Sequence, residues 1–111
     1  EAVRLLLDRG ARLEARNEDD DTPLHIACFD GNVEVASFLL SRGADLEAIS
    51  DRGYRPLHFA VIYNRSKIVG LLLDRGANVE ATTLEGTTPL SLACQGGDVE
   101  MVWLLVRRCP W

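Results

Sequence analysis

The chain lacks long apolar runs and any targeting segment at its start. Although 47% of its 111 residues are hydrophobic, no stretch approaches the roughly 18 apolar residues that a membrane-spanning helix needs. The first residues, Glu1 to Arg4, have neither the basic start nor the apolar core of a secretory signal. We therefore expect one compact soluble domain and no membrane partner.

Basic residues are also scarce. The chain has 12 Lys and Arg against 17 Asp and Glu, which gives a net charge of −5, and Lys67 is its only lysine. A protein that binds nucleic acid needs a basic face to neutralise the phosphates. The charge therefore argues against a nucleic-acid partner.

The motifs of enzyme and cofactor sites are missing as well. The three cysteines form no C-x-x-C pair, which leaves a zinc or redox site with little support. No G-x-S-x-G segment frames a serine nucleophile, and no G-K-[ST] follows Gly86 or the pair Gly96-Gly97, as a phosphate-binding loop requires. We expect no catalytic activity, no metal site and no cofactor in this chain.

What the chain does contain is an internal repeat. The segment Thr22-Pro23-Leu24-His25 returns as Arg55-Pro56-Leu57-His58 and as Thr88-Pro89-Leu90-Ser91, each time after 33 residues. A fixed period of this length indicates tandem copies of one supersecondary unit, each of which buries its apolar face only against its neighbours. Such a stack presents a long exposed surface and seldom a closed pocket, which favours a binding module.

The same period governs positions outside this segment. Glycine recurs at Gly10, Gly43 and Gly76, glutamate at Glu14, Glu47 and Glu80, and leucine at Leu6, Leu39, Leu72 and Leu105. The agreement at many positions predicts a partial unit at residues 1–16, full units at 17–49 and 50–82, and a terminal or truncated unit at 83–111. Because the chain begins without Met and in the second half of a unit, we expect a fragment of a longer protein.

These residues resemble the ankyrin repeat family. The resemblance rests on Thr22-Pro23-Leu24-His25-Ile26-Ala27, on Arg55-Pro56-Leu57-His58-Phe59-Ala60 and on Leu71-Leu72-Leu73-Asp74-Arg75-Gly76-Ala77, and it covers essentially the whole chain. It implies an all-α repeat solenoid of helix–turn–helix units joined by β-hairpin loops. It also implies binding to other proteins, without naming a partner.

Within each unit, the pattern predicts a short first helix that begins at a proline and a longer second helix rich in leucine. Asn64 occupies the position of Gly31 and Gly97, where a residue that tolerates a left-handed conformation ends the first helix. Asp20 replaces a glycine found at Gly53 and Gly86, and we expect a strained positive φ if that loop requires one.

The histidines and cysteines are predicted to be structural. His25 and His58 lie one unit apart, too far to share a metal ion, and the resemblance implies that this histidine makes hydrogen bonds between units. Cys28 and Cys94 occupy the same position two units apart, so we expect small buried side chains in a reducing compartment and no disulfide. Trp103 is expected to cover Gly70 at the end of the stack, with a partner contact as the alternative.

The resemblance places partner contacts at the loop tips and at the exposed ends of the first helices. An apolar centre of Phe29, Tyr54, Ile62 and Tyr63 is expected there, because aromatics surrounded by charge are typical of an interface; the alternative is that Phe29 or Tyr63 packs on the adjacent helix. The residues predicted to contact a partner are Glu18, Asp19, Asp21, Phe29, Asp30, Asp51, Arg52, Tyr54, Ile62, Tyr63, Leu84, Glu85, Thr87 and Gln95.

Four consecutive acidic residues, Glu18 to Asp21, precede the first complete helix pair. They either stabilise the start of that helix through its dipole or form a docking point for a basic partner segment, whose binding would weaken with salt.

The sequence thus predicts a protein–protein interaction module, a fragment of an adaptor, scaffold or regulatory protein that binds partners through its concave face and loop tips. Two alternatives stay open: a structural element that self-associates through truncated ends, and a substrate-targeting segment of an enzyme whose catalytic domain lies elsewhere. We expect a cytoplasmic location, with the nucleus as the alternative.

Overall fold

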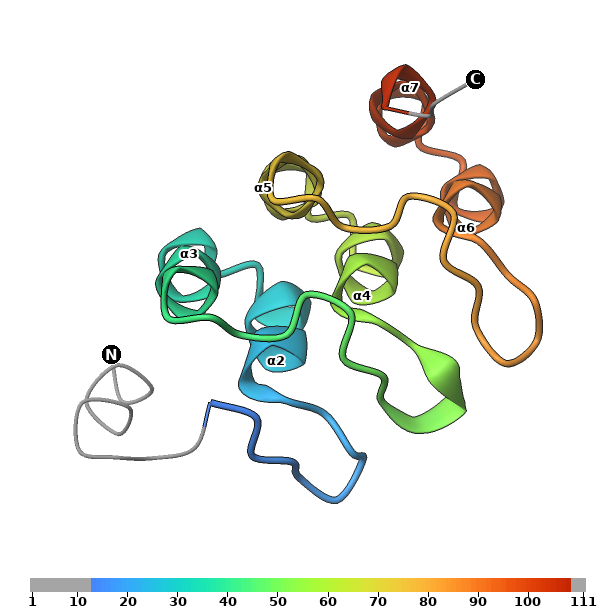
Figure 1. Cartoon of the computed structure of the whole chain (residues 1–111). Helices are drawn as coiled ribbons and strands as arrows, with labels where there is room; N and C mark the ends of the chain where they lie inside the picture. Colours follow the sequence, from blue (N-terminus) through green and yellow to red (C-terminus); the bar gives the residue numbers. More distant parts are fainter. Residues whose placement is uncertain (1–12, 109–111) are drawn as a thin grey trace.

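The computed structural model describes residues 13–108, which form helix pairs stacked side by side (Figure 1). Helices α2, α4 and α6 form one row, α3, α5 and α7 form a second row, and long loops project from the side of the first row (Figure 1). The elements are α2 (Pro23–Asp30), α3 (Val33–Ser41), the short 3-10 helix η1 (Asp51–Gly53), α4 (Pro56–Ile62), α5 (Ser66–Asp74), α6 (Pro89–Gly96) and α7 (Val99–Arg107). The predicted all-α repeat solenoid is confirmed.

Local sequence explains where the first helices begin and end. A proline stands at the first position of α2, α4 and α6, where the missing N–H would have no helical partner. Thr22 and Thr88 cap two of these helices through their side-chain oxygens. Gly31 and Gly97 follow α2 and α6 with a positive φ, and Asn64 follows α4 with a φ of 58°, as its position predicted.

The core runs between the two rows of helices. Leu24 and Leu57 from the first row meet Leu39, Leu72 and Leu105 from the second row, and all five are buried. Helices of seven to nine residues are marginal in isolation. Their stability therefore comes from packing between units, as the repeat pattern predicted.

The loops differ from the expected β-hairpins, because no strand is present within residues 13–108. Each loop is closed by two backbone hydrogen bonds. In the first bond of each loop, the N–H of Asn17, Ser50 or Thr83 donates to the carbonyl of Asp21 (3.1 Å), Tyr54 (2.8 Å) or Thr87 (2.9 Å), respectively. In the second, the N–H of Asp20, Gly53 or Gly86 donates back to the carbonyl of Asn17 (3.0 Å), Ser50 (3.0 Å) or Thr83 (2.9 Å). Most of the partial unit predicted at residues 1–16, and Cys109, lie outside the described residues, and the predicted unit boundaries stay a prediction.

Neighbouring loops are bound to one another. The N–H of Asp51 donates to the carbonyl of Asp19 (3.3 Å), and 33 residues later the N–H of Leu84 donates to the carbonyl of Arg52 (3.0 Å). The turn that allows this approach has a positive φ at Asp20 (65°), Gly53 (78°) and Gly86 (82°). Asp20 therefore adopts the conformation that its replacement of glycine predicted.

Two of the expected packing positions are wrong. Trp103 does not cover Gly70, because no atom lies within 4 Å of a Cβ built there, and 61% of Trp103 is exposed. Cys94 is exposed, whereas Cys28 is buried. The reason is the same for Trp103 and Cys94: no helix pair follows α6 and α7 within the part of the chain that the structure describes.

Gly53 and Gly86 provide a matched test of the loop packing. A Cβ on Gly53 would lie 2.7 Å from the backbone nitrogen of Leu84, whereas a Cβ on Gly86 meets no atom within 4 Å. We expect Gly86→Ala to cost about 1–2 kcal/mol from its left-handed backbone alone. Gly53→Ala adds overpacking and should cost at least about 3 kcal/mol in urea unfolding. Equal losses in the two variants would contradict the contact between the loops.

Candidate functional site

A buried histidine joins each of the first two complete units to the loop beyond it. The Nδ1 atom of His25 accepts hydrogen bonds from the N–H of Thr22 (3.1 Å) and from its hydroxyl (2.9 Å), which leaves the ring proton on Nε2. Nε2 then donates to the carbonyl of Tyr54 at 2.9 Å, in the loop of the next unit. The bond between units that the resemblance implied for His25 is therefore present.

His58 repeats this arrangement in the next unit. Its Nδ1 atom accepts from the N–H of Arg55 (2.9 Å), and its Nε2 atom donates to the carbonyl of Ala81 (3.0 Å). Burial lowers the pKa of both His25 and His58 below the ordinary value of 6.5, so both rings are neutral at pH 7. No group of three or more potential metal-ligating side chains occurs within residues 13–108.

A groove lies near these histidines, between the loops and the row of first helices. It has a volume of about 690 Å³ and lies between the first helices and the loops at residues 17–21 and 50–54. Its walls combine exposed aromatic rings with acidic side chains. The lining residues are Asn17, Asp19, Asp21, Ile26, Phe29, Asp30, Ser50, Asp51, Arg52, Tyr54, Phe59 and Tyr63.

The aromatic rings of the groove form one connected cluster across two units. Phe29, near the end of α2, meets Tyr63, just after α4, edge to face with ring centroids 4.6 Å apart. Phe59 touches Tyr63 (6.2 Å) and Tyr54 (5.9 Å), and His25 packs beneath Phe59 (5.2 Å). Phe29 and Tyr63 remain 46% and 42% exposed. The rings are thus held in place by one another while a large apolar area stays open to solvent.

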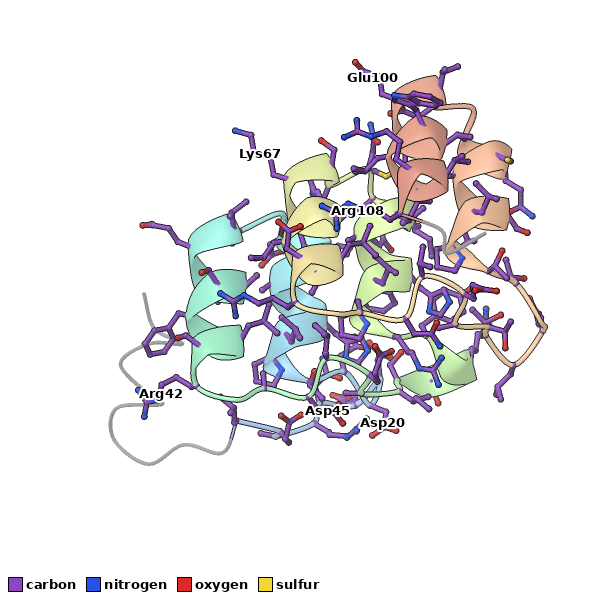
Figure 2. All side chains as sticks on the ribbon, turned by 45° about the horizontal axis from the view of Figure 1, so that its top comes forward. Asp20, Arg42, Asp45, Lys67, Glu100 and Arg108 are labelled. Atoms are coloured by element: carbon purple, nitrogen blue, oxygen red, sulfur yellow. The ribbon has the colours of Figure 1, made fainter. Side chains whose placement is uncertain are left out.

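The acidic side chains of the groove have little compensation. Within residues 13–108, no ion pair joins Asp19, Asp21, Asp30 or Asp51 to a cation. The pKa of Asp21 is raised, mainly by its partial burial and further by the neighbouring charges of Asp19 and Asp20. Asp20 lies at the loop end of the molecule, and Lys67 and Glu100 lie at the opposite end of the helices (Figure 2).

Most of the predicted contact residues converge on this groove. Eight of them line it, from both loops and from the ends of both first helices: Asp19, Asp21, Phe29, Asp30, Asp51, Arg52, Tyr54 and Tyr63. Phe29 and Tyr63 also pack on each other across the two units. Packing on the adjacent unit, which was the alternative to a partner contact, therefore does not prevent these rings from lining the groove.

The remaining predicted residues lie elsewhere. Ile62 does not belong to the aromatic centre, because it lines a second hollow between α4 and α6; Phe59, three residues earlier on α4, takes its place. Leu84 and Glu85 are exposed at the tip of the third loop, where Thr87 is half-buried. Glu18 is exposed on the first loop, and Gln95 is exposed on α6.

Four lining residues were missed by the sequence prediction: Asn17, Ile26, Ser50 and Phe59. Helical spacing could have identified two of them, because Ile26 lies three residues before Phe29, and Phe59 lies four residues before Tyr63. Such spacings place side chains on one face of a helix. Asn17 has a structural role too, since its Oδ1 atom accepts from the N–H of Asp19 and of Asp21 (2.9 Å each).

The thiols offer no reactive centre in this groove. Burial raises the pKa of Cys28 to about 12, which suppresses the thiolate that nucleophilic or metal-binding chemistry needs. Cys94 is a free exposed thiol on α6, and α6 contributes no residue to the groove.

The fold and the groove define a helical repeat solenoid with a continuous surface of loops and first helices. A family model described as ankyrin repeats in three copies matches residues 1–83, and a model of the single ankyrin repeat matches residues 85–110. The chain therefore belongs to the ankyrin repeat family.

Ankyrin repeats generally act as protein–protein interaction modules and are typically not catalytic. No curated protein matches the chain. None of the helices within residues 13–108 has the length and apolar character needed to cross a membrane.

The neutral histidines make the fold sensitive to mild acid. Because burial lowers the pKa of His25 and His58, the unfolded chain takes up protons near 6.5 before the folded chain does. The stability that the neutral rings provide is therefore complete above this value and is lost as the pH falls below it. The free energy of unfolding falls by at most about 1.4 kcal/mol per pH unit for each histidine.

Urea unfolding at about pH 7.5 and about pH 5.5 measures this effect, and His58→Gln should remove about half of it. The raised pKa of Asp21 means that its protonation stabilises the fold as the pH falls, which opposes the effect of the histidines. The chain with His58 and the chain with His58→Gln are therefore both measured in an Asp21→Asn background. A stability that does not change between the two pH values would show that the rings are not held neutral.

Proposed function

We propose that this chain binds a partner protein along the groove between its first helices and its loops, as one segment of a larger adaptor, scaffold or regulatory protein. The observation that carries the proposal is the pair of Phe29 and Tyr63, which are nearly half-exposed although they pack on each other. Aromatic side chains of this kind, rigid and partly solvated, are frequent hot spots of protein interfaces.

The groove is also well ordered before any partner arrives. Tyr54 is held from below by the hydrogen bond between its carbonyl and His25, and its loop is bound to the preceding loop through Asp19. Arg65 fixes the end of α2 by donating to the carbonyl of Phe29 from Nε (3.2 Å) and from Nη2 (2.9 Å). A surface that is already rigid loses little conformational entropy on binding, which favours affinity.

The cellular location stays a proposal as well. The free thiols of Cys28 and Cys94 suit a reducing compartment. We therefore retain the cytoplasm as the expected site of action, with the nucleus as the alternative.

Tyr63→Ala tests the proposal in a pull-down from a cell lysate with the whole chain as bait. We expect the captured protein to be lost or reduced at least about tenfold, because truncation of a hot-spot aromatic costs about 2 kcal/mol or more of binding energy. Trp103→Ala is the matched control, since Trp103 is an exposed aromatic on α7 outside the groove. Equal capture by the Tyr63 variant and the wild-type chain would contradict a role of the groove, and a collapse of the melting temperature would show a packing role for Tyr63.

Self-association is a second candidate that one observation favours. Val99 (79% exposed), Trp103 and Val106 are uncovered apolar residues on α7, spaced so that they share one helix face. A stripe of this kind suits a contact with a second copy.

Light scattering decides between the candidates: self-association predicts a mass that rises with concentration and a Trp103→Ser variant that stays monomeric. A monomeric wild-type chain at all concentrations excludes it.

A further inference from the structure

The groove carries negative charge that no ion pair within residues 13–108 neutralises. Four carboxylates line it, against one guanidinium, that of Arg52. Elsewhere some acidic groups are paired, since Asp74 pairs with Arg108 at 2.5 Å and Glu47 lies 3.5 Å from Arg55, while Glu34 and Glu100 form no ion pair within residues 13–108. What distinguishes the groove is that four such carboxylates line one hollow together with exposed aromatic rings.

Asp30 is the clearest case. It is the last residue of α2, where the helix dipole disfavours a negative charge by about 0.3–1 kcal/mol. The equivalent positions in the following units hold Tyr63 and Gly96, so the repeat pattern does not require an acid there. Asp30 is exposed and lines the groove beside Phe29. Asp30 thus adds negative charge to the groove at a position where the repeat does not require an acid, although Arg65 donates to the carbonyl of the preceding residue, Phe29.

The other three carboxylates are brought together by the loops. Asp19 and Asp51 belong to neighbouring loops that share a backbone hydrogen bond of 3.3 Å, and Asp21 lies two residues from Asp19. Neighbouring carboxylates repel one another, and a cation that enters the groove is attracted by several of them at once.

The aromatic rings supply the second half of the recognition. Phe29 and Tyr63 expose ring surface within the same groove as Asp30. A planar guanidinium stacks on an aromatic face and is more weakly hydrated than an ammonium, so arginine gains more than lysine from such a surface. Rings and carboxylates in one groove therefore match an arginine side chain in both shape and charge.

We propose that the groove binds an extended, arginine-containing segment of the partner protein, with one guanidinium against the Phe29–Tyr63 pair beside Asp30 and further positive charge near Asp19 and Asp51. This inference rests on the proposed function, because it assigns the chemistry of the partner to the same groove. The partner segment would cross from α2 to α4, the two helices that carry the ring pair.

The chain contains two built-in reporters for a test. Tyr54 and Tyr63 are its only tyrosines, and both line the groove. In a chain labelled with fluorotyrosine, fluorine NMR therefore reports on this surface alone. The probes are a short peptide of alternating arginine and glycine and a matched peptide in which glutamine replaces arginine. We expect the arginine peptide to shift the tyrosine signals and the glutamine peptide to leave them unchanged.

Two variants with equal changes of net charge separate the groove from general attraction. Asp30→Asn with Asp51→Asn removes two groove carboxylates, and Glu34→Gln with Glu100→Gln removes two exposed carboxylates outside it. Glu100 lies at the end of the molecule opposite the loops (Figure 2). We expect the groove variant to weaken peptide binding by about tenfold or more and the control variant by less than about twofold. Removal of Asp30 should not lower the melting temperature, because its charge opposes the helix dipole.

Three outcomes would overturn the inference: equal weakening in the two variants, equal binding of the glutamine peptide, or tyrosine signals that shift with protein concentration alone, which would assign the groove to a second copy. If the arginine peptide fails while Tyr63→Ala still abolishes capture in the pull-down, the groove binds a partner of different chemistry. If both fail, the proposed function fails with the inference.

Discussion

The hydrogen bond from the buried imidazole of His25 to the carbonyl of Tyr54 connects the helical stack to its exposed surface. A neutral hydrogen bond contributes only about 1 kcal/mol net, but a buried donor left without a partner costs about 1–3 kcal/mol. The ring therefore strongly specifies where the next loop lies. Tyr54 and the groove wall beside it take their positions from this contact, and His58 repeats it with Ala81.

The acidic residues of the chain fall into two groups that differ in their contacts. Glu14 and Glu47 accept hydrogen bonds from the backbone N–H of Asp45 and Asn78, each at 2.8 Å and each 31 residues further on. These glutamates join successive units and repeat with the period of the fold. Among the groove aspartates, Asp21 is hydrogen-bonded to Ser50 of the next loop, but none of the four forms an ion pair within residues 13–108, so their charge is not neutralised there.

The repeat pattern was enough to predict the features that depend on local backbone geometry. The prolines mark the starts of the first helices, Asn64 substitutes for glycine after α4, and Asp20 takes a positive φ, because each position must adopt one particular conformation in every unit. The loops were predicted less well: the resemblance implied β-hairpins, whereas each loop is a turn with two backbone hydrogen bonds and no strand within residues 13–108. Their shape depends on bonds to the neighbouring loop, which a single unit does not reveal.

The sequence by itself determined the repeated unit and its two helices, and the family resemblance implied the hydrogen-bonding role of the histidines and the placement of aromatic and acidic residues near one edge. Only the tertiary structure decided which of these side chains meet. Phe29 contacts Tyr63, whereas Ile62, which directly precedes Tyr63 in the sequence, lines a different hollow. The reason is that adjacent residues on a helix point about 100° apart. Cys94 is exposed where Cys28 is buried, because burial at that position requires a following unit. Contacts between units depend on how the units are offset and rotated, and no single repeat encodes that arrangement.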